Sequence, residues 1–179
     1  MSYIKDIRGF TLFMLSFLLF SCATKPPIAT DWPPEKNAIR LHIMADPELN
    51  RYDGTPHTLL ICLYQLQSKN SFSQLVEDKD GIYKLLECAL FDASVVRSKR
   101  LIVQPGQDST VDIDRAEGAK YVGVVAGYFL LERERIVRLF DVPLIMEKKG
   151  WKRVRFEKPD LLDIDLALGP EQIHSNEGK

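Results

Sequence analysis

Apolar residues recur at every second position in several short stretches of the chain, and this alternation constrains the fold more than any other feature. In residues 39–45, isoleucine, leucine and alanine alternate with more polar side chains, which is typical of a strand with one buried face. Residues 162–168 repeat the pattern, with leucine and isoleucine alternating with aspartate over most of their length. Residues 58–66 are apolar on both faces in their middle, which predicts a central strand.

Shorter apolar runs predict the remaining strands. They cover residues 101–103, 111–113, 121–131, 137–145 and 151–156. The longest of these runs contains Gly123, Ala126 and Gly127. Small residues at such positions fit a central strand that another layer crosses closely. Between the first two strands, Asp46 to His57 is rich in turn-forming residues and predicts a long loop.

One helix is expected between the strands. Ile82 begins an apolar stripe that continues at Leu85, Leu86, Ala89 and Leu90, with Asp80 as the expected N-cap. Seven or eight short strands with one helical insertion predict a mostly β fold, a two-sheet β-sandwich. We find no internal repeat and expect no second domain.

Composition limits the classes of function. The chain has 179 residues, of which 45% are hydrophobic, and a formal net charge of −1. This length suits one folded domain, and the balanced charge argues against a nucleic-acid partner. Three cysteines and three histidines are scattered along the chain, so we expect neither a metal site nor a cofactor.

The N-terminal segment has the pattern of an export signal. Lys5 and Arg8 precede an apolar run over 10–20 that is too short for a permanent membrane anchor. The run ends in Leu-Phe-Ser before Cys22, a sequence that resembles a bacterial lipobox. We therefore expect residues 1–21 to be removed and Cys22 to carry a covalent lipid. Ala23 follows where an aspartate would favour the inner membrane, so we expect the periplasmic face of the outer membrane.

Residues 22–37 are expected to form a lipid-anchored tether. Four prolines lie in this stretch and favour an extended, semi-rigid chain. Its fourteen residues from Ala23 to Lys36 reach at most roughly 46 Å. We expect the β-sandwich domain to cover residues 38–169 and residues 170–179 to be a polar C-terminal tail.

No catalytic signature supports an enzyme. The sequence lacks the G-x-S-x-G, S-x-x-K, H-E-x-x-H and phosphate-binding glycine patterns. Aspartates flank an isoleucine on two predicted strands, as Asp112 with Asp114 and as Asp163 with Asp165. Exposed strand faces explain these pairs without a bound cation, and we expect His42 to be a solvated or edge residue.

The two remaining cysteines leave alternatives open. Cys62 lies in the second predicted strand and Cys88 beside the helical stripe. An export compartment permits a disulfide, but spacing alone cannot establish one. We expect two buried free thiols that pack as small hydrophobic side chains. The charge run Glu132–Arg135 is expected to form a solvated turn between strands.

Several short motifs, taken in order, resemble one family. They are Leu49-Asn50, Gly54-Thr55-Pro56, Leu63-Tyr64-Gln65-Leu66, Phe72 with Leu75, Gln104-Pro105-Gly106, and the segment from Ala119 to Tyr128. With the lipobox they cover Cys22 to about Phe140. The chain resembles the outer-membrane lipoprotein of bacterial type VI secretion systems (the TssJ, SciN or VasD family). In the family a Trp-Arg pair often stands where this chain has Arg135-Ile136-Val137-Arg138.

The resemblance implies a transthyretin-like β-sandwich that acts as a scaffold. Such lipoproteins bind the periplasmic part of an IcmF-like (TssM) inner-membrane protein in an envelope-spanning complex. The family's contact loop corresponds to residues 46–57, so the expected partner-binding residues are Asn50, Arg51, Tyr52, Asp53, Gly54 and Pro56. Arginine and tyrosine are favoured at binding hot spots. The alternatives are a small-ligand-binding lipoprotein, which needs an apolar pocket, and a lipoprotein hydrolase.

Overall fold

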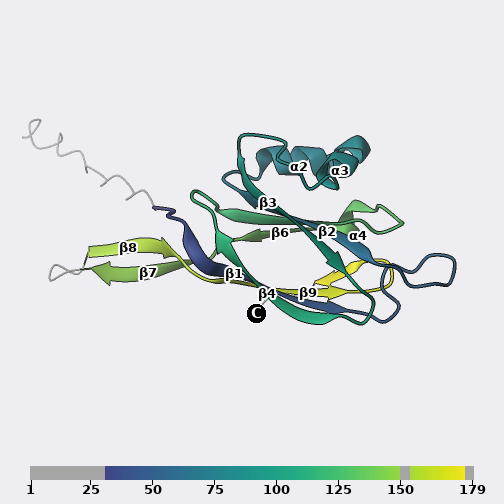
Figure 1. The fold of residues 1–179 in the computed structure, drawn as a ribbon. Coiled ribbons are helices and arrows are strands. Elements are labelled where there is room, and N and C mark those ends of the chain that lie inside the picture. The colour runs from purple at the N-terminus through teal and green to yellow at the C-terminus, as the bar shows by residue number, and fades with distance from the viewer. Residues whose placement is uncertain (1–30, 150–153, 176–179) are drawn as a thin grey trace, which may run out of the picture.

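A computed structural model describes residues 31–149 and 154–175 of the chain. Two four-stranded sheets stack on each other (Figure 1). In the first sheet, residues 162–168 run parallel to residues 39–45, and the other pairings are antiparallel. The strand order is β10 (Ile173–Ser175), β9 (Leu162–Leu168), β1 (Glu35–Ala45) and β4 (Asp108–Arg115).

The second sheet is wholly antiparallel. Its order is β3 (Val95–Val103), β2 (Leu59–Leu66), β5 (Tyr121–Ala126) and β6 (Val137–Asp141). Strand β2 is central and buried on both faces, which confirms the prediction for residues 58–66. The outer face of this sheet is covered by α2 (Asn70–Glu77) and α3 (Lys79–Leu85), and a short helix, α4 (Arg133–Ile136), precedes β6.

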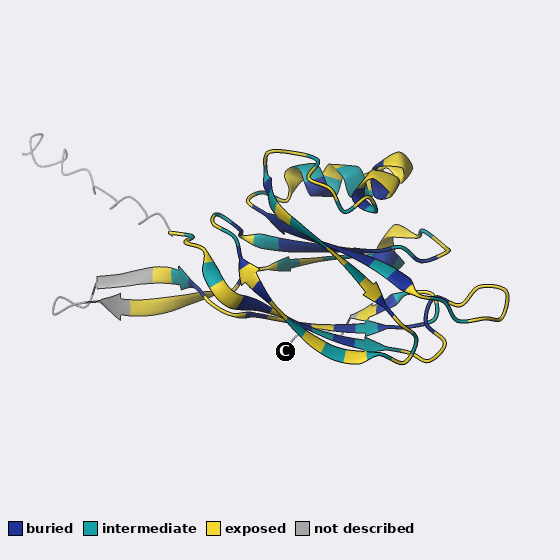
Figure 2. Ribbon diagram, in the orientation of Figure 1, coloured by how far each residue is buried: buried dark blue, intermediate teal, exposed yellow. Residues whose placement is uncertain are grey.

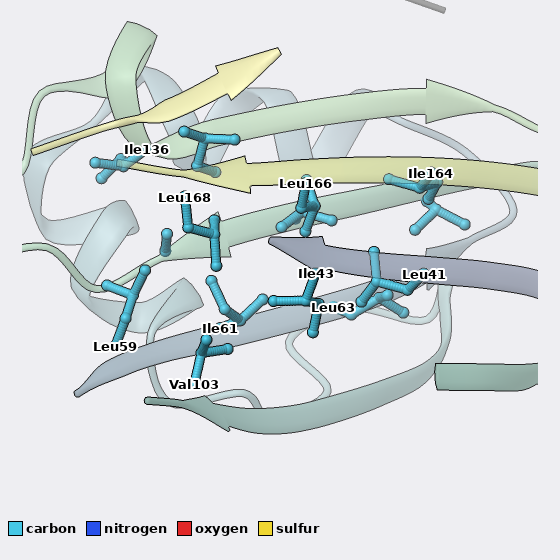
Figure 3. Close-up of a cluster of buried hydrophobic side chains, with 14 of the residues drawn as sticks. Leu41, Ile43, Leu59, Ile61, Leu63, Val103, Ile136, Ile164, Leu166 and Leu168 are labelled. Atoms are coloured by element: carbon cyan, nitrogen blue, oxygen red, sulfur yellow. The ribbon is translucent and has the colours of Figure 1, made fainter. Parts of the chain in front are cut away.

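The main core lies between the two sheets. Alternating side chains of β1 and β9 meet those of β2, β3 and β5, and the close-up in Figure 3 shows them interdigitating. Leu41 and Ile61, for example, have no exposed surface. The opposite face of the first sheet is exposed and charged, so burial alternates along each strand (Figure 2). The predicted two-sheet sandwich is therefore confirmed.

A second, smaller core lies between the second sheet and the helices. The outward side chains of β2 pack there with α2 and α3. Phe72 of α2 lies directly over Gly123, where any added Cβ would come within 2.7 Å of its ring. This contact explains the glycine in β5 and confirms that another layer crosses the strand closely. Burial raises the pKa of Tyr64 to about 12, and its hydroxyl donates to the Leu85 carbonyl.

The helical insertion differs from the prediction at both ends. Two helices form instead of one, and the cap of α3 is Asp78 rather than Asp80, because the Asp78 carboxylate accepts the Asp80 N–H. The helix ends at Leu85, so the apolar stripe does not continue to Leu90, which is 60% exposed. Cys88 has a φ of 55°, a left-handed conformation that no α-helix contains.

The expectation of two free thiols is wrong. Cys62 and Cys88 form a disulfide with their Cα atoms 5.0 Å apart, a separation typical of such bonds. The bond joins the outward face of β2 to the segment that follows α3. The spacing of the two cysteines could not reveal this, because it depends on the chain reversing after Leu85.

Strands β7 (Leu144–Lys149) and β8 (Val154–Pro159) form a separate two-stranded sheet. Strand β10 lies in the range expected to be a polar tail, where Ile173 is buried and pairs with Leu168. The predicted signal peptide and Cys22 lie outside the described residues. No helix in the described ranges is both long and apolar enough to cross a membrane.

The sandwich has two distinct ends (Figure 1). At one, which we call the tether end, β1 begins at Glu35, and the β7–β8 hairpin projects from the same end. At the other, the apical end, β1 finishes at Ala45 and the loop over residues 46–58 begins. The expected partner-binding loop therefore lies at the end of the domain opposite the start of β1.

Candidate functional site

The apical loop ends in a tight turn with a defined conformation. Tyr52 and Thr55 exchange two backbone hydrogen bonds of 3.0 Å each. Between them, Asp53 and Gly54 both have positive φ values of 48° and 74°. This is the arrangement of a type I′ turn, for which Asp-Gly is a preferred sequence. The turn holds Tyr52 at the tip of the loop in one orientation.

Asn50 fastens the loop to the domain. Its side chain is only 5% exposed, donates through Nδ2 to the Thr58 carbonyl at 3.0 Å and accepts the Phe129 N–H at 3.1 Å. The neighbouring Leu49 is fully buried, and the Arg51 N–H donates to the Pro170 carbonyl at 2.8 Å. Asn50 thus positions the loop, whereas Arg51, Tyr52, Asp53 and Gly54 are exposed and Pro56 is half-buried.

The Tyr52 ring stacks on Phe129 with centroids 4.2 Å apart and an interplanar angle of 15°. His57 approaches the Phe129 ring edge-on at 5.2 Å. Although they pack on each other, Tyr52 and Phe129 remain 56% and 54% exposed, and Leu130 beside them is 49% exposed. We call Tyr52, His57, Phe129 and Leu130 the apical aromatic patch.

Phe129 and Leu130, half of this patch, lie in a segment for which the sequence predicted a strand. The prediction covered residues 121–131, but β5 ends at Ala126 and the segment 127–131 is a loop. Gly127 donates its N–H to the Leu60 carbonyl as the chain leaves the sheet. Aromatic and aliphatic residues in an apolar run resemble a buried strand. The neighbouring strand β2 begins at Leu59, one residue before the partner of Gly127. Phe129 and Leu130 therefore lie beyond the sheet, which the sequence alone does not show.

Charged residues surround the patch. Arg51 forms an ion pair with Glu48, with 3.5 Å between Nε and Oε2. Arg135 of α4 contacts both Glu132 and Glu171. The expected solvated turn over Glu132–Arg135 is therefore largely a short helix that carries these ion pairs. An apolar centre inside a polar rim is the usual anatomy of a protein–protein interface.

The exposed face of the first sheet carries a different cluster. His42 on β1 lies between Asp108 of β4 and Asp165 of β9, at 3.1 and 3.2 Å. The hydrogen bond to Asp108, which has the larger effect, and the hydrogen bond to Asp165 both raise the pKa of His42. Two residues earlier on the same face of β1, Arg40 lies between Asp112 of β4 and Asp163 of β9. Cross-strand contacts of this kind account for Asp112, Asp163 and Asp165, and Asp114 accepts the Asn37 N–H. His42 is on an inner strand rather than an edge.

Possible metal ligands and buried titratable groups were the remaining candidates for a chemical site. Within residues 31–149 and 154–175, no three histidine, cysteine or acidic side chains converge as metal ligands would. Burial raises the pKa of Tyr128, and its hydroxyl donates to the Gln172 carbonyl at 2.9 Å. Tyr128 therefore fastens the C-terminal segment to the sandwich.

Comparisons with known proteins agree with this fold. The family model of the type VI secretion lipoproteins (VasD, EvfM, TssJ) matches residues 37–158. The type VI lipoprotein TssJ1 from Pseudomonas aeruginosa is 22% identical with a TM-score of 0.56, and the match covers 79% of this chain and 95% of that chain. Lip from Serratia marcescens, a membrane-bound component of the type VI secretion system, is 21% identical with a TM-score of 0.60, covering 82% and 99%.

A third similar chain belongs to the structure of the C-terminal domain of the type VI protein TssM from EAEC. It is 19% identical with a TM-score of 0.55, and the match covers 76% of this chain and 94% of that chain. No curated protein matches the chain. The likeness to these structures establishes the fold, and the family model covers most of the sandwich from β1 into β8.

Proposed function

The chain belongs to the family of type VI secretion lipoproteins, and from that premise we propose that it is a membrane-anchored scaffold. It binds the periplasmic part of an IcmF-like (TssM) inner-membrane protein through the apical aromatic patch. The observation that carries this proposal is the stacked pair of Tyr52 and Phe129, which stays more than half exposed at the end of the sandwich remote from the tether.

The physical state of the patch favours binding. Large aromatic side chains dominate the energetics of interfaces, and their exposure in water is unfavourable unless a partner covers them. The type I′ turn and the two hydrogen bonds of Asn50 fix the loop before binding. A preformed loop loses little conformational entropy when the partner docks.

The class of partner is supported by the similar structures. A chain with this fold is part of the structure of the TssM C-terminal domain from EAEC. TssM is therefore the partner class that we assign to the patch. The role requires no chemistry of its own, and we propose that the protein is not an enzyme and uses no cofactor.

The anchor in this proposal is a covalent lipid on Cys22, formed after removal of residues 1–21. Several acyl chains on one cysteine give stable attachment, whereas one chain gives only marginal binding. The outer membrane, on its periplasmic face, is the proposed location. Metabolic labelling with a palmitate analogue is expected to mark the wild type and not Cys22→Ser, and cell fractionation is expected to move the variant out of the outer membrane. A labelled Cys22→Ser protein would contradict this anchor.

Co-purification tests the patch. We expect a tagged wild type, extracted with detergent, to recover an IcmF-like protein identified by mass spectrometry. Tyr52→Ala with Phe129→Ala, and separately Arg51→Ala with Tyr52→Ala, are expected to lower the recovery at least about tenfold, because each double variant removes a hot-spot residue.

Ile102→Ala is the matched control, since Ile102 on β3 is 55% exposed but lies outside the patch. We expect this variant to recover the partner as the wild type does. Equal recovery with all variants would move the contact elsewhere on the domain. Failure of the wild type to recover any IcmF-like protein would overturn the proposed function.

A further inference from the structure

The β7–β8 hairpin is the part of the fold that the scaffold role leaves unexplained. It extends away from both four-stranded sheets (Figure 1) and has no third strand. Its root is closed by one hydrogen bond of 2.9 Å from the Asp160 N–H to the Pro143 carbonyl. An isolated two-stranded hairpin is marginally stable in water. Such a projection is expected to gain stability from a surface that it contacts.

The described part of the hairpin exposes three consecutive apolar residues. Leu144, Ile145 and Met146 are 44%, 43% and 61% exposed. Since side chains alternate along a strand, Ile145 lies on one face of the hairpin, and Leu144 and Met146 lie on the other. Both faces of the hairpin therefore offer apolar contact, which suits insertion among lipid molecules.

The two strands also carry an excess of positive charge. Lys148 and Arg155 occupy paired positions in the register of the two strands. Over both strands, four cationic residues stand against Glu147 and Glu157; they are Lys148, Lys149, Arg155 and Lys158. An anionic surface is complementary to this excess of positive charge.

The hairpin lies at the end of the domain where the chain leaves toward Cys22. Strand β9 follows the hairpin directly, and its first residue, Leu162, pairs with Ile39 near the start of β1. Trp32 follows Cys22 by ten positions, a span of at most roughly 33 Å. The six residues of β7 extend about 20 Å from the root. The hairpin can therefore reach a lipid surface that holds Cys22.

We propose that the β7–β8 hairpin is a second membrane contact, which docks on the phosphate-bearing headgroups of the lipid surface that holds the anchor. Apolar side chains enter the interfacial region while the lysines and arginine of the strands bind phosphate groups. Together with the tether, this contact holds the long axis of the sandwich away from the membrane and directs the apical aromatic patch into the periplasm. The geometry of the inference rests on the proposed anchoring of Cys22, but its test does not.

Vesicle flotation tests the contact without the acyl group. The protein is the chain from residue 22 to Lys179 with Cys22→Ser, which retains every described residue. We expect it to bind vesicles of phosphatidylethanolamine and phosphatidylglycerol, and binding is expected to weaken as salt is added. Lys148→Gln with Arg155→Gln should weaken binding about 25-fold, since each cation near an anionic surface contributes roughly fivefold. Leu144→Asn with Met146→Asn should lower the bound fraction at every salt concentration.

The matched control is Lys79→Gln with Lys84→Gln, which removes the same charge from exposed positions on α3. We expect this variant to bind as the parent does, and circular dichroism should show the same fold for all proteins. Equal weakening by the control would show that vesicle binding depends only on net charge, and would overturn the proposal. Absence of vesicle binding by the parent, or binding only to peptidoglycan sacculi, would also overturn it. Because no partner protein is present, these outcomes are independent of the proposed function.

Discussion

At the scale of single residues, His42 couples the stability of the domain to pH. Its pKa is raised in the folded state by Asp108 and Asp165. A raised pKa means that the folded state binds the proton more tightly, so the stabilisation is complete below the unfolded value of about 6.5 and is lost as pH rises through the higher folded value. We expect urea midpoints of the wild type to fall over this window and those of His42→Gln to fall less. Parallel pH profiles would contradict the role of His42.

The contribution of Asn50 to stability can be separated into hydrogen bonding and backbone strain. Asn50→Ala leaves the Phe129 N–H and the Thr58 carbonyl without their partner, which costs about 1–3 kcal/mol. Alanine is also strained at a φ of 49°, which costs about 1–2 kcal/mol more. Asn50→Gly loses the same hydrogen bonds without this strain, so we expect it to be the more stable variant in urea unfolding. The reverse order would show that the positive φ at position 50 does not strain alanine.

Both residues show what the sequence can and cannot reveal. Alternation placed His42 on the exposed face of its strand, but its two aspartate partners come from strands that are distant in sequence. The motif containing Asn50 was identified through the family resemblance, which the family model confirms. The burial of Asn50 depends on Phe129, which the sequence placed inside a strand. The partner-binding role of residues 50–56 stays a prediction.

At the scale of elements, the disulfide fastens the helical insertion to the sheet. It closes a loop with a sequence separation of 26, and constraining a loop of that length stabilises the folded state by about 3.5 kcal/mol. We expect Cys62→Ala with Cys88→Ala to lower the unfolding free energy by about 3–4 kcal/mol in urea. Reductant should lower the stability of the wild type by a similar amount and leave the double variant unchanged. Insensitivity of the wild type to reductant would count against the bond.

Strands were more predictable than the elements between them. Period-two alternation depends only on which face of a strand is buried, so residues 39–45 and 162–168 were placed correctly. The ends of α3 and β5 depend on tertiary contacts: Cys88 turns the chain toward Cys62, and Gly127 leaves the sheet at Leu60. Strand β10 was missed because three residues with one buried isoleucine give no periodic signal.

At the scale of the whole molecule, the two proposed contacts lie at opposite ends of the sandwich. The apical aromatic patch follows the end of β1, and the β7–β8 hairpin projects from the end where β1 begins. The eleven residues of this strand span about 36 Å. Distant sites without shared contacts act additively. The fold therefore predicts that partner binding measured in detergent does not depend on the hairpin, and that vesicle binding does not depend on the apical aromatic patch.

This independence can be measured with three proteins. Tyr52→Ala with Phe129→Ala should lower partner recovery and leave vesicle binding unchanged, and Lys148→Gln with Arg155→Gln should do the opposite. The quadruple variant should show both losses, each equal to that of its own pair within about 0.5 kcal/mol. A hairpin variant that also loses the partner in detergent would show that the hairpin belongs to the protein interface. Loss of the partner only in intact membranes would instead show that the hairpin acts by orienting the domain, because detergent removes the surface on which orientation depends.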